Sequence, residues 1–277
     1  MGSAFNRQFA SLTEEPRWCG DGPALLYTMA HGAGGGGPVV VVAGPDGEER
    51  DWSARSLVTA SRVLAEGGCT VVRFDYRGQG ESGGVYEETS VASRTDDLLA
   101  VCGWARTAYG QDPAVLGVRL GASVALMAAA RQPWISRLVL WEPIANHGAY
   151  VNALLRQNLS AQMVVHGSVQ KDRAALLDEA RAGTPINVNG YVMTGTFVDE
   201  LLALDSANLQ LDRPMLIISG KELQGPMARQ SRAVYTRIPC VPFWKEPKLY
   251  SAGPFSLLEP TLTWLLQTTT TTLREVS

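Results

Sequence analysis

The sequence predicts an α/β protein whose sheet is mostly parallel, with helices on both faces. Short apolar, β-branched runs alternate with longer segments of helical periodicity along most of the 277 residues, which is the pattern of β–α–β units. The alternation stops after Trp141 and resumes at Pro214, so the segment between them is an insertion. A strand, a turn from Gly117 to Gly121 and an Ala-rich helix follow one another, and α/β sites lie where strands end in such turns.

The strands are predicted from continuous apolar runs, because a strand covered on both faces has no polar side. The first covers 24–29 and is followed by a flexible glycine-rich loop at 32–37. Further strands are expected at 38–43, 69–74, 114–116, 137–141 and 214–219. Helical periodicity predicts helices at 53–66, 91–108, 122–131, 150–165, 171–182 and 197–204. The polar run 268–272 is expected to be a frayed end.

Composition excludes several classes of function. The net charge is −3 and the pI is about 5.7, without a basic stripe, so no nucleic-acid partner is expected. No window holds the roughly 18 apolar residues of a membrane span, and the first residues lack the apolar core of a signal peptide. The four cysteines have no metal or redox spacing. We therefore expect a cytoplasmic protein with reduced thiols, no cofactor, no metal and no membrane contact, in an oligomeric state that the sequence leaves open.

Three stretches together resemble the α/β-hydrolase superfamily. The stretch 75–82 reads DYRGQGES, which is similar to the family's D-x-R-G-x-G-x-S turn after the fourth strand. The stretch 117–121 resembles the family's nucleophile elbow, and 214–220 resembles the strand before its acid loop. The stretches 44–50 and 140–143 further resemble the serine-aminopeptidase-like branch, which includes exosortase-associated hydrolases. The resemblance implies an eight-stranded, mostly parallel sheet formed by 1–143 and 213–277, with a helical cap at 144–212.

The catalytic triad of that family is missing from its expected positions. The elbow residue is Arg119, whose guanidinium stays protonated and has no lone pair for nucleophilic attack. The acid position falls on Leu223, with Glu222 beside it, and the base position falls on Pro254. No histidine follows His166, so no shift of register restores a base. A Ser-His-Asp mechanism needs all three groups, and we therefore expect no serine-hydrolase activity.

The remaining groups predict an anion site. In the family, the backbone N–H after the elbow residue and one from the loop after the third strand stabilise an oxyanion. These positions are Leu120 and Asp46, whereas Pro45 would supply no N–H after a shift by one residue. Arg119 adds a permanent charge and a bidentate fork, and Leu120 opens a helix, whose N-terminus favours an anion. We expect a small-molecule or peptide ligand with an anionic group.

Arg119 has an alternative role as a filler of the lost site. It would then fold back and pair with Asp46, Glu48 or Glu142. Glu142 ends a strand at the edge of the sheet where α/β sites lie, so its other candidate role is that of a general base. His147, in the segment that enters the insertion, is a second candidate base, with a solvated loop position as the alternative.

Two aromatic residues are candidates for the lining of the pocket. Trp141 ends a predicted strand, and Tyr76 lies in the turn after another. Packing in the core is the alternative for both. Ser123, one helical turn beyond the elbow, is expected to face the packed interior and not to replace the nucleophile.

Three functions fit these residues. The first is non-hydrolytic proton transfer, as in an epimerase, isomerase or lyase, on a small acidic or peptide substrate whose enolate Arg119 and backbone N–H groups would stabilise. Such chemistry resembles that of the triad-less hydrolase-fold group containing the bottromycin-pathway peptide epimerase. The second is a pseudoenzyme that binds a ligand without turnover. The third is a hydrolase with a relocated nucleophile.

Overall fold

An eight-stranded sheet forms the centre of the protein in a computed structural model, which describes residues 12–20, 25–204, 211–223, 230–245 and 253–274, with side chains up to residue 267. The strand order is β1-β2-β4-β3-β5-β6-β9-β10. Strands β1 and β2 are antiparallel to their neighbours, and the remaining pairs are parallel. This arrangement confirms the predicted mostly parallel sheet. The strands are β1 Glu14–Cys19, β2 Leu26–His31, β3 Val39–Ala43, β4 Thr70–Phe74, β5 Ala114–Val118, β6 Arg137–Trp141, β9 Met215–Ser219 and β10 Ala233–Arg237.

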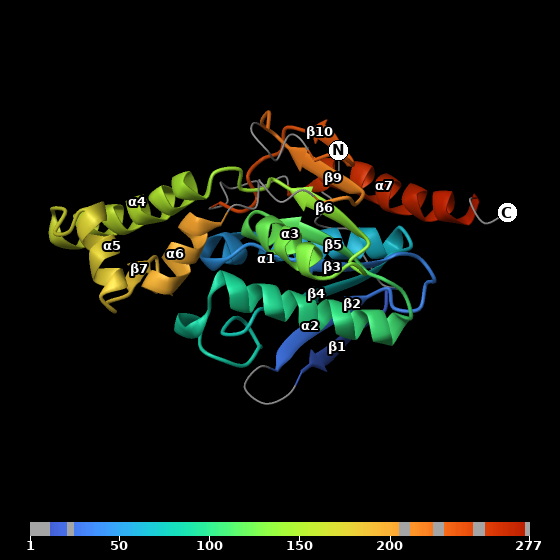
Figure 1. The fold of residues 1–277 in the computed structure, drawn as a ribbon, viewed down its shortest axis with the longest axis horizontal. Coiled ribbons are helices and arrows are strands. Elements are labelled where there is room, and N and C mark those ends of the chain that lie inside the picture. Colours follow the sequence, from blue (N-terminus) through green and yellow to red (C-terminus); the bar gives the residue numbers. More distant parts are fainter. Residues whose placement is uncertain (1–11, 21–24, 205–210, 224–229, 246–252, 275–277) are drawn as a thin grey trace.

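Two pairs of helices cover the sheet (Figure 1). Helices α2 (Val91–Tyr109) and α3 (Leu120–Arg131) pack on one face, and α1 (Gly47–Glu66) and α7 (Phe255–Arg274) pack on the other. Strand β3 is buried along its whole length, because both faces of the sheet are covered there. A short 3-10 helix, η3 (Tyr86–Glu88), follows the turn after β4.

The ends of the sheet differ most from the prediction. The outer strands β1 and β10 are largely exposed, so they lack the apolar runs by which the inner strands were predicted. The C-terminal helix α7 extends from Phe255 to Arg274. The expectation of a frayed end at 268–272 is therefore wrong. Buried leucines of α7, among them Leu257 and Leu265, anchor the helix against the sheet.

The insertion between β6 and β9 is mainly helical but also contains a hairpin. Its helices are α4 (His147–His166), α5 (Arg173–Arg181) and α6 (Gly195–Ala203), and its strands are β7 (Ile186–Val188) and β8 (Tyr191–Met193). The turn residues Asn189 and Gly190 both have positive φ, at 52° and 93°, as in the tight turns that Asn-Gly favours. The hairpin was not predicted, although this dipeptide is its sequence signal.

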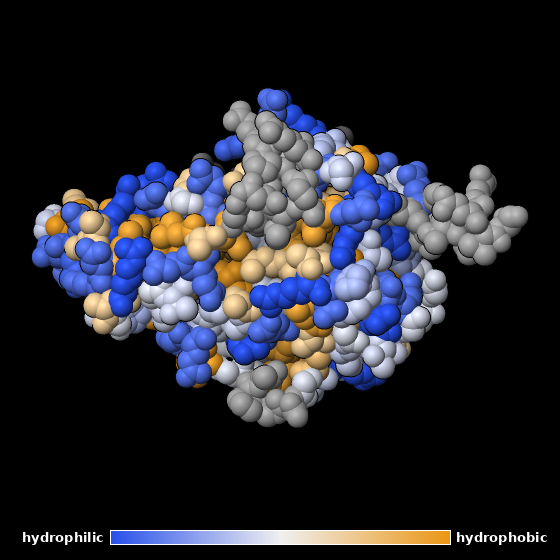
Figure 2. Space-filling model, viewed as in Figure 1, coloured by the Kyte–Doolittle hydropathy of each residue, from blue (hydrophilic) through white to orange (hydrophobic). Residues whose placement is uncertain are grey.

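The insertion extends to one side of the core (Figure 1). On the face seen there, hydrophobic residues show along the line where the insertion meets the core, with polar residues over much of the remaining surface (Figure 2). No helix in the described part of the chain combines the length and hydropathy needed to cross a membrane.

Candidate functional site

The turn between β5 and α3 has the geometry of a nucleophile elbow. Arg119 lies at φ 56° and ψ −118°, a conformation that costs a non-glycine residue roughly 1–3 kcal/mol. The glycines on either side allow close packing. A Cβ on Gly117 would lie 2.6 Å from Cα of Ala122, and one on Gly121 would lie 2.1 Å from the carbonyl oxygen of Ala43. The fold therefore holds the Arg119 side chain at the carboxyl edge of the sheet.

The guanidinium of Arg119 is held by four neighbours. Its Nη2 donates to Glu49 Oε1 at 2.9 Å, its Nε lies 3.2 Å from both oxygens of the same carboxylate, and its Nη1 donates to the backbone oxygen of Glu142 at 3.2 Å. The ring centres of Trp244 and Tyr150 lie 5.0 and 5.9 Å from its Cζ. Arg119 is thus an ion-paired, ring-stacked group with 18% of its side chain exposed.

This pairing corrects the predicted filler arrangement. Arg119 does fold back onto a carboxylate, but its partner is Glu49, not Asp46, Glu48 or the carboxylate of Glu142. Glu48 and Glu49 are neighbours in the first turn of α1. Their side chains point in different directions from the helix, and only that of Glu49 reaches the elbow.

Glu49 is the most perturbed carboxyl group near the elbow. Burial raises its pKa above the ordinary value, and the nearby Asp46 charge acts in the same direction. The positive charge of Arg119 and its hydrogen bonds partly offset this rise, with a smaller effect from Lys245. A carboxyl group of raised pKa in a cleft is a candidate for proton transfer.

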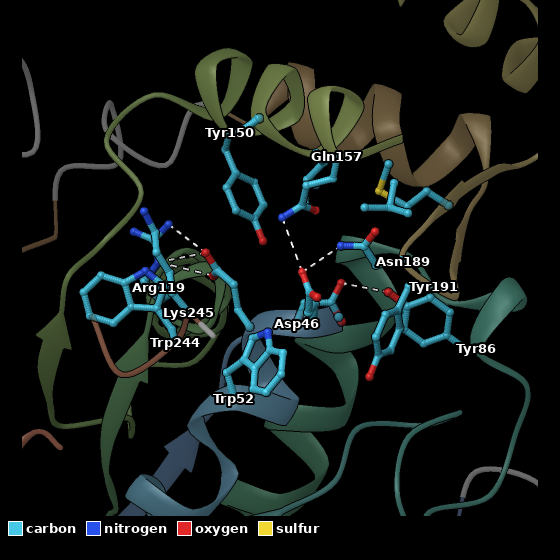
Figure 3. Close-up of a pocket in the computed structure, with 17 residues that line it drawn as sticks. Asp46, Trp52, Tyr86, Arg119, Tyr150, Gln157, Asn189, Tyr191, Trp244 and Lys245 are labelled. Carbon is cyan, nitrogen blue, oxygen red and sulfur yellow. Dashed lines mark hydrogen bonds and ion pairs between the residues drawn. The ribbon is translucent and has the colours of Figure 1, made fainter. Parts of the chain in front are cut away.

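A cavity of about 530 Å³ opens in front of Arg119. In Figure 3, helix α4 lies above it and helix α1 lies below it. Five aromatic rings, three carboxylates and two cationic side chains contribute to its walls. The lining residues are Asp46, Gly47, Glu48, Glu49, Trp52, Tyr86, Arg119, Tyr150, Ala153, Leu154, Gln157, Val188, Asn189, Tyr191, Met193, Trp244 and Lys245.

Asp46 lines the cavity, but its carboxylate belongs to a buried network. Oδ1 forms an ion pair with Nη2 of Arg94 at 2.8 Å and accepts from the amide of Gln79 at 2.7 Å, and Oδ2 accepts from the hydroxyl of Tyr86 at 3.1 Å. Arg94 is itself 1% exposed and lies over the rings of Tyr76 and Tyr86. These contacts fix the loop after β3, so Asp46 is a structural part of the cavity wall.

The two predicted bases do not line the cavity. Glu142 has φ 47°, and its carboxylate turns toward the end of β9, where it accepts from the backbone N–H of Gly220 at 2.5 Å and lies 3.4 Å from the hydroxyl of Ser219. His147 opens α4, is 6% exposed, and its Nε2 lies 2.9 Å from the Ser123 hydroxyl. Neither predicted base therefore borders this cavity, and the solvated position expected for His147 is wrong.

Four of the predicted binding residues lie outside the cavity wall. Trp141 is buried, and its indole N–H donates to Thr261 at 3.0 Å on the α7 side of the sheet. Pro45 and Tyr76 border a separate cavity of about 240 Å³. The side chain of Leu120 packs into the core of the insertion, which leaves only its backbone at the elbow.

The positions expected for the family's acid and base carry apolar residues in the structure. Leu223 packs against the α2–α3 side of the core, and Pro254 is buried just before α7. Within the described residues, no group of three or more His, Cys, Asp or Glu side chains is placed to hold a metal ion.

Sequence reasoning missed most of the cavity wall. Trp52 and Glu49 come from α1, Gln157 from α4, and Asn189 and Tyr191 from the hairpin. The Asn-Gly dipeptide could have revealed the hairpin, but no local signal shows that it meets α1. That contact is tertiary, since Asn189 donates to Glu48 at 2.9 Å across 141 positions of sequence.

The sheet order, the elbow and the insertion over the site define an α/β-hydrolase fold. A profile of the serine aminopeptidase S33 family matches residues 51–251. The chain belongs to this family, as the resemblance of its sequence indicated. No curated protein sequence matches the chain significantly.

Solved structures share the fold at low sequence identity. A putative hydrolase from Agrobacterium vitis S4 is 14% identical, with a TM-score of 0.58 over 92% of this chain and 99% of that one. Est1E from Butyrivibrio proteoclasticus, with ferulic acid bound, is 15% identical, with a TM-score of 0.58 over 96% and 98%. A proline iminopeptidase-related protein from Thermus thermophilus is 20% identical, with a TM-score of 0.56 over 92% and 98%. These likenesses concern the fold alone.

Proposed function

We propose that the cavity binds a small acidic molecule or peptide and that the protein transfers a proton on it without hydrolysis, as an epimerase, isomerase or lyase does. The observation that carries the proposal is the pairing of Glu49 with Arg119 inside the cavity. A partly buried carboxyl group and a guanidinium fork thus lie where the family has its nucleophile.

Arg119 would anchor the anionic group of the ligand. A carboxylate or enolate oxygen can replace Glu49 on the guanidinium fork, because both make the same charge-assisted hydrogen bonds. Leu120 opens α3 directly after Arg119, and the N–H groups at the start of a helix favour negative charge. An enolate formed next to a carbonyl would be stabilised by these donors.

Glu49 would be the proton-transfer group. Displacement from Arg119 removes the interaction that holds its pKa down, and burial then raises that pKa further. A carboxylate of raised pKa is a better base for a carbon-bound proton, and a positioned base contributes about 10²–10⁴-fold to rate. This assignment replaces Glu142 and His147, neither of which borders the cavity.

The composition of the wall supports a reaction other than serine-type hydrolysis. None of the described residues that line the cavity is a serine, threonine, cysteine or histidine. The Ser123–His147 pair is the nearest arrangement to a relocated nucleophile and base. Ser123 is 1% exposed and His147 6% exposed, and neither lines the cavity, so the pair has no approach for a substrate there.

A ligand-binding protein without turnover is the second candidate. It is favoured by the completeness of the Arg119 contacts, since Glu49, the Glu142 carbonyl and two rings already surround the guanidinium. In that case the Glu49–Arg119 pair serves to fill the elbow and to select ligands.

Deuterium exchange tests the proposal. The protein is incubated in D₂O with N-acetyl dipeptide acids, 2-oxo acids and the matched amides, and deuterium at the carbon next to the carbonyl is followed by mass spectrometry. We expect exchange into an acid but not into its amide, and a loss of about 10²–10⁴-fold in Glu49→Gln. Glu87→Gln, an exposed acid-to-amide change in η3, is the matched control. Binding in calorimetry without exchange would favour the second candidate.

A further inference from the structure

We propose that the end of the cavity opposite Arg119 binds an ammonium group, so that the ligand is a zwitterion with a free amine and an acidic group. The inference rests on the proposed function, because it takes Arg119 as the anchor of the acidic group. It adds a second charged subsite to the same cavity and thereby narrows the class of ligand.

The two ends of the cavity carry opposite charges. Arg119 and Lys245 lie together beside Trp244 at one end, whereas Asn189, Tyr191 and Tyr86 lie at the other (Figure 3). Two carboxylates meet these residues: Asp46 accepts from the hydroxyl of Tyr86, and Glu48, in the first turn of α1, accepts from Asn189. A ligand that spans the cavity therefore meets cations at one end and an anion at the other.

Glu48 is the cavity carboxylate without a counter-charge. Asp46 is paired with Arg94 at 2.8 Å, and Glu49 is paired with Arg119 at 2.9 Å. In the described part of the chain Glu48 has only neutral partners. Its Oε2 accepts from the amide of Asn189 at 2.9 Å and from that of Gln157 at 3.4 Å. These amides orient the carboxylate and leave its charge uncompensated, which favours a cation from the ligand.

The surroundings of Glu48 suit an ammonium group better than a neutral donor. The rings of Tyr86 and Tyr191 meet edge to face with centres 5.2 Å apart, and the half-exposed ring of Trp52 stands on the same helix as Glu48. The faces of tyrosine and tryptophan attract cations through their quadrupoles. Because Arg94 already lies over the ring of Tyr86, a ligand cation would turn to Tyr191 or Trp52. Carboxylate and rings together therefore select positive charge, whereas a hydroxyl would gain only a hydrogen bond.

A further acceptor lies next to Glu48. The side-chain oxygen of Gln157 is buried and has no hydrogen-bond partner within the described residues. The same side chain reaches down from α4 into the cavity (Figure 3), and its amide nitrogen donates to Glu48 at 3.4 Å. A buried acceptor without a donor is costly. An ammonium group has three N–H donors, enough to bond Glu48 and Gln157 together.

Calorimetry with simple probes tests the inference. The probes are 4-aminobutanoate, 6-aminohexanoate and 8-aminooctanoate, together with butanoate, hexanoate and octanoate as carboxylates of equal length without the amine. We expect at least one amino acid of the series to bind about tenfold more tightly than its plain carboxylate, because one charge-assisted contact is worth about one such factor. The preferred length reports the span between the two subsites.

Two variants test whether Glu48 causes the tighter binding of the amino acid probes. Glu48→Gln should remove the preference for the amine while plain carboxylates bind as before, and Glu87→Gln should retain it. If Glu48→Gln does not fold, as judged by circular dichroism, Asn189→Lys provides the second variant, since a lysine there places a cation beside Glu48 and should abolish the same preference.

The outcomes separate this inference from the proposed function. Three results would overturn the ammonium subsite. Plain carboxylates could bind as tightly as every amino acid probe, the preference for the amine could survive in Glu48→Gln, or no probe could bind at all. Deuterium exchange on acids without any amine preference would overturn it while the proposed function stands. An amine preference without any exchange would support the subsite and contradict the catalytic proposal.

Discussion

Arg119 occupies the backbone position that the fold reserves for a nucleophile, and it retains the positive φ of that position. A carboxylate and an aromatic ring lie against its guanidinium. Glu49 supplies a counter-charge, and Trp244 stacks on the guanidinium. The elbow thus holds an ion pair, and we expect that a hydroxyl placed at this position would meet no histidine in the described wall of the cavity.

Arg119→Ser should therefore remain inactive as a hydrolase. We expect no labelling by a fluorophosphonate probe and no ester turnover above a denatured control, for wild type and variant alike, because no histidine lines the cavity in the described structure to take the hydroxyl proton. A known serine hydrolase serves as the control for the probe. Stoichiometric labelling that disappears in Ser123→Ala would instead identify the Ser123–His147 pair as a relocated nucleophile and base.

Among the elements, strands β1, β2 and β4 are joined by a charged cluster around His31. This residue is fully buried at the end of β2. Its Nδ1 lies 2.6 Å from Glu14 of β1, and its Nε2 accepts from Arg73 of β4 at 3.1 Å. Arg62 of α1 holds both oxygens of Glu14 at 2.8 Å. The neutral ring donates at one nitrogen and accepts at the other, so protonation would place two N–H donors against each other.

This cluster makes stability fall as the pH falls. Burial, reinforced by Arg73, lowers the pKa of His31 from 6.5 to about 4. Below about pH 6.5 the unfolded state takes up a proton that the folded state does not, so stability is complete above that value and is lost toward pH 4. Hydrogen bonds from Arg62 lower the pKa of Glu14 to about 2, which extends the loss below pH 4.5.

Urea unfolding between about pH 7.5 and 4.5 measures the effect. We expect wild type to lose about 2 kcal/mol over this range, somewhat less than the full pKa difference implies. His31→Gln can donate and accept without titrating, so its stability should depend less on pH. His166→Gln, at an exposed position, is the control. Equal slopes for wild type and His31→Gln would contradict the assignment.

At the scale of the whole molecule, the insertion shares its hydrophobic core with the sheet domain. Val91 of α2 and Leu120 of α3 lie in the same cluster as the buried residues of α4, α5 and α6. Arg94 lies 5.4 Å from the ring centre of Phe197, and Glu200 accepts from the backbone N–H of Ala92 at 3.1 Å. The cavity wall itself combines α1, α4 and the hairpin, so the site exists only where these parts meet.

The isolated insertion, residues 144–212, should therefore not fold. Removed from the core, it would expose the face that packs on α2 and α3, and a segment this short buries too little apolar surface to offset its conformational entropy. Circular dichroism should show low helicity without a cooperative thermal transition, whereas the full chain, measured in parallel, should unfold cooperatively. A cooperative transition of the isolated segment would show that the insertion is an independent unit.

The sequence by itself determined the fold class and the elbow, and it predicted the loss of the triad. Buried parallel strands appear as apolar runs, and the elbow requires Gly117 and Gly121 within a few residues of Arg119, so both signals are local. The residues that line the cavity could not be predicted from local sequence patterns. Whether Glu48 or Glu49 reaches Arg119 depends on the rotation of α1, and Asn189 meets Glu48 only after the insertion has packed. Glu142 ends its strand as predicted, but its positive φ turns the carboxylate toward Gly220. Side-chain direction at the ends of elements is set by packing between distant segments, and only the tertiary structure decided it.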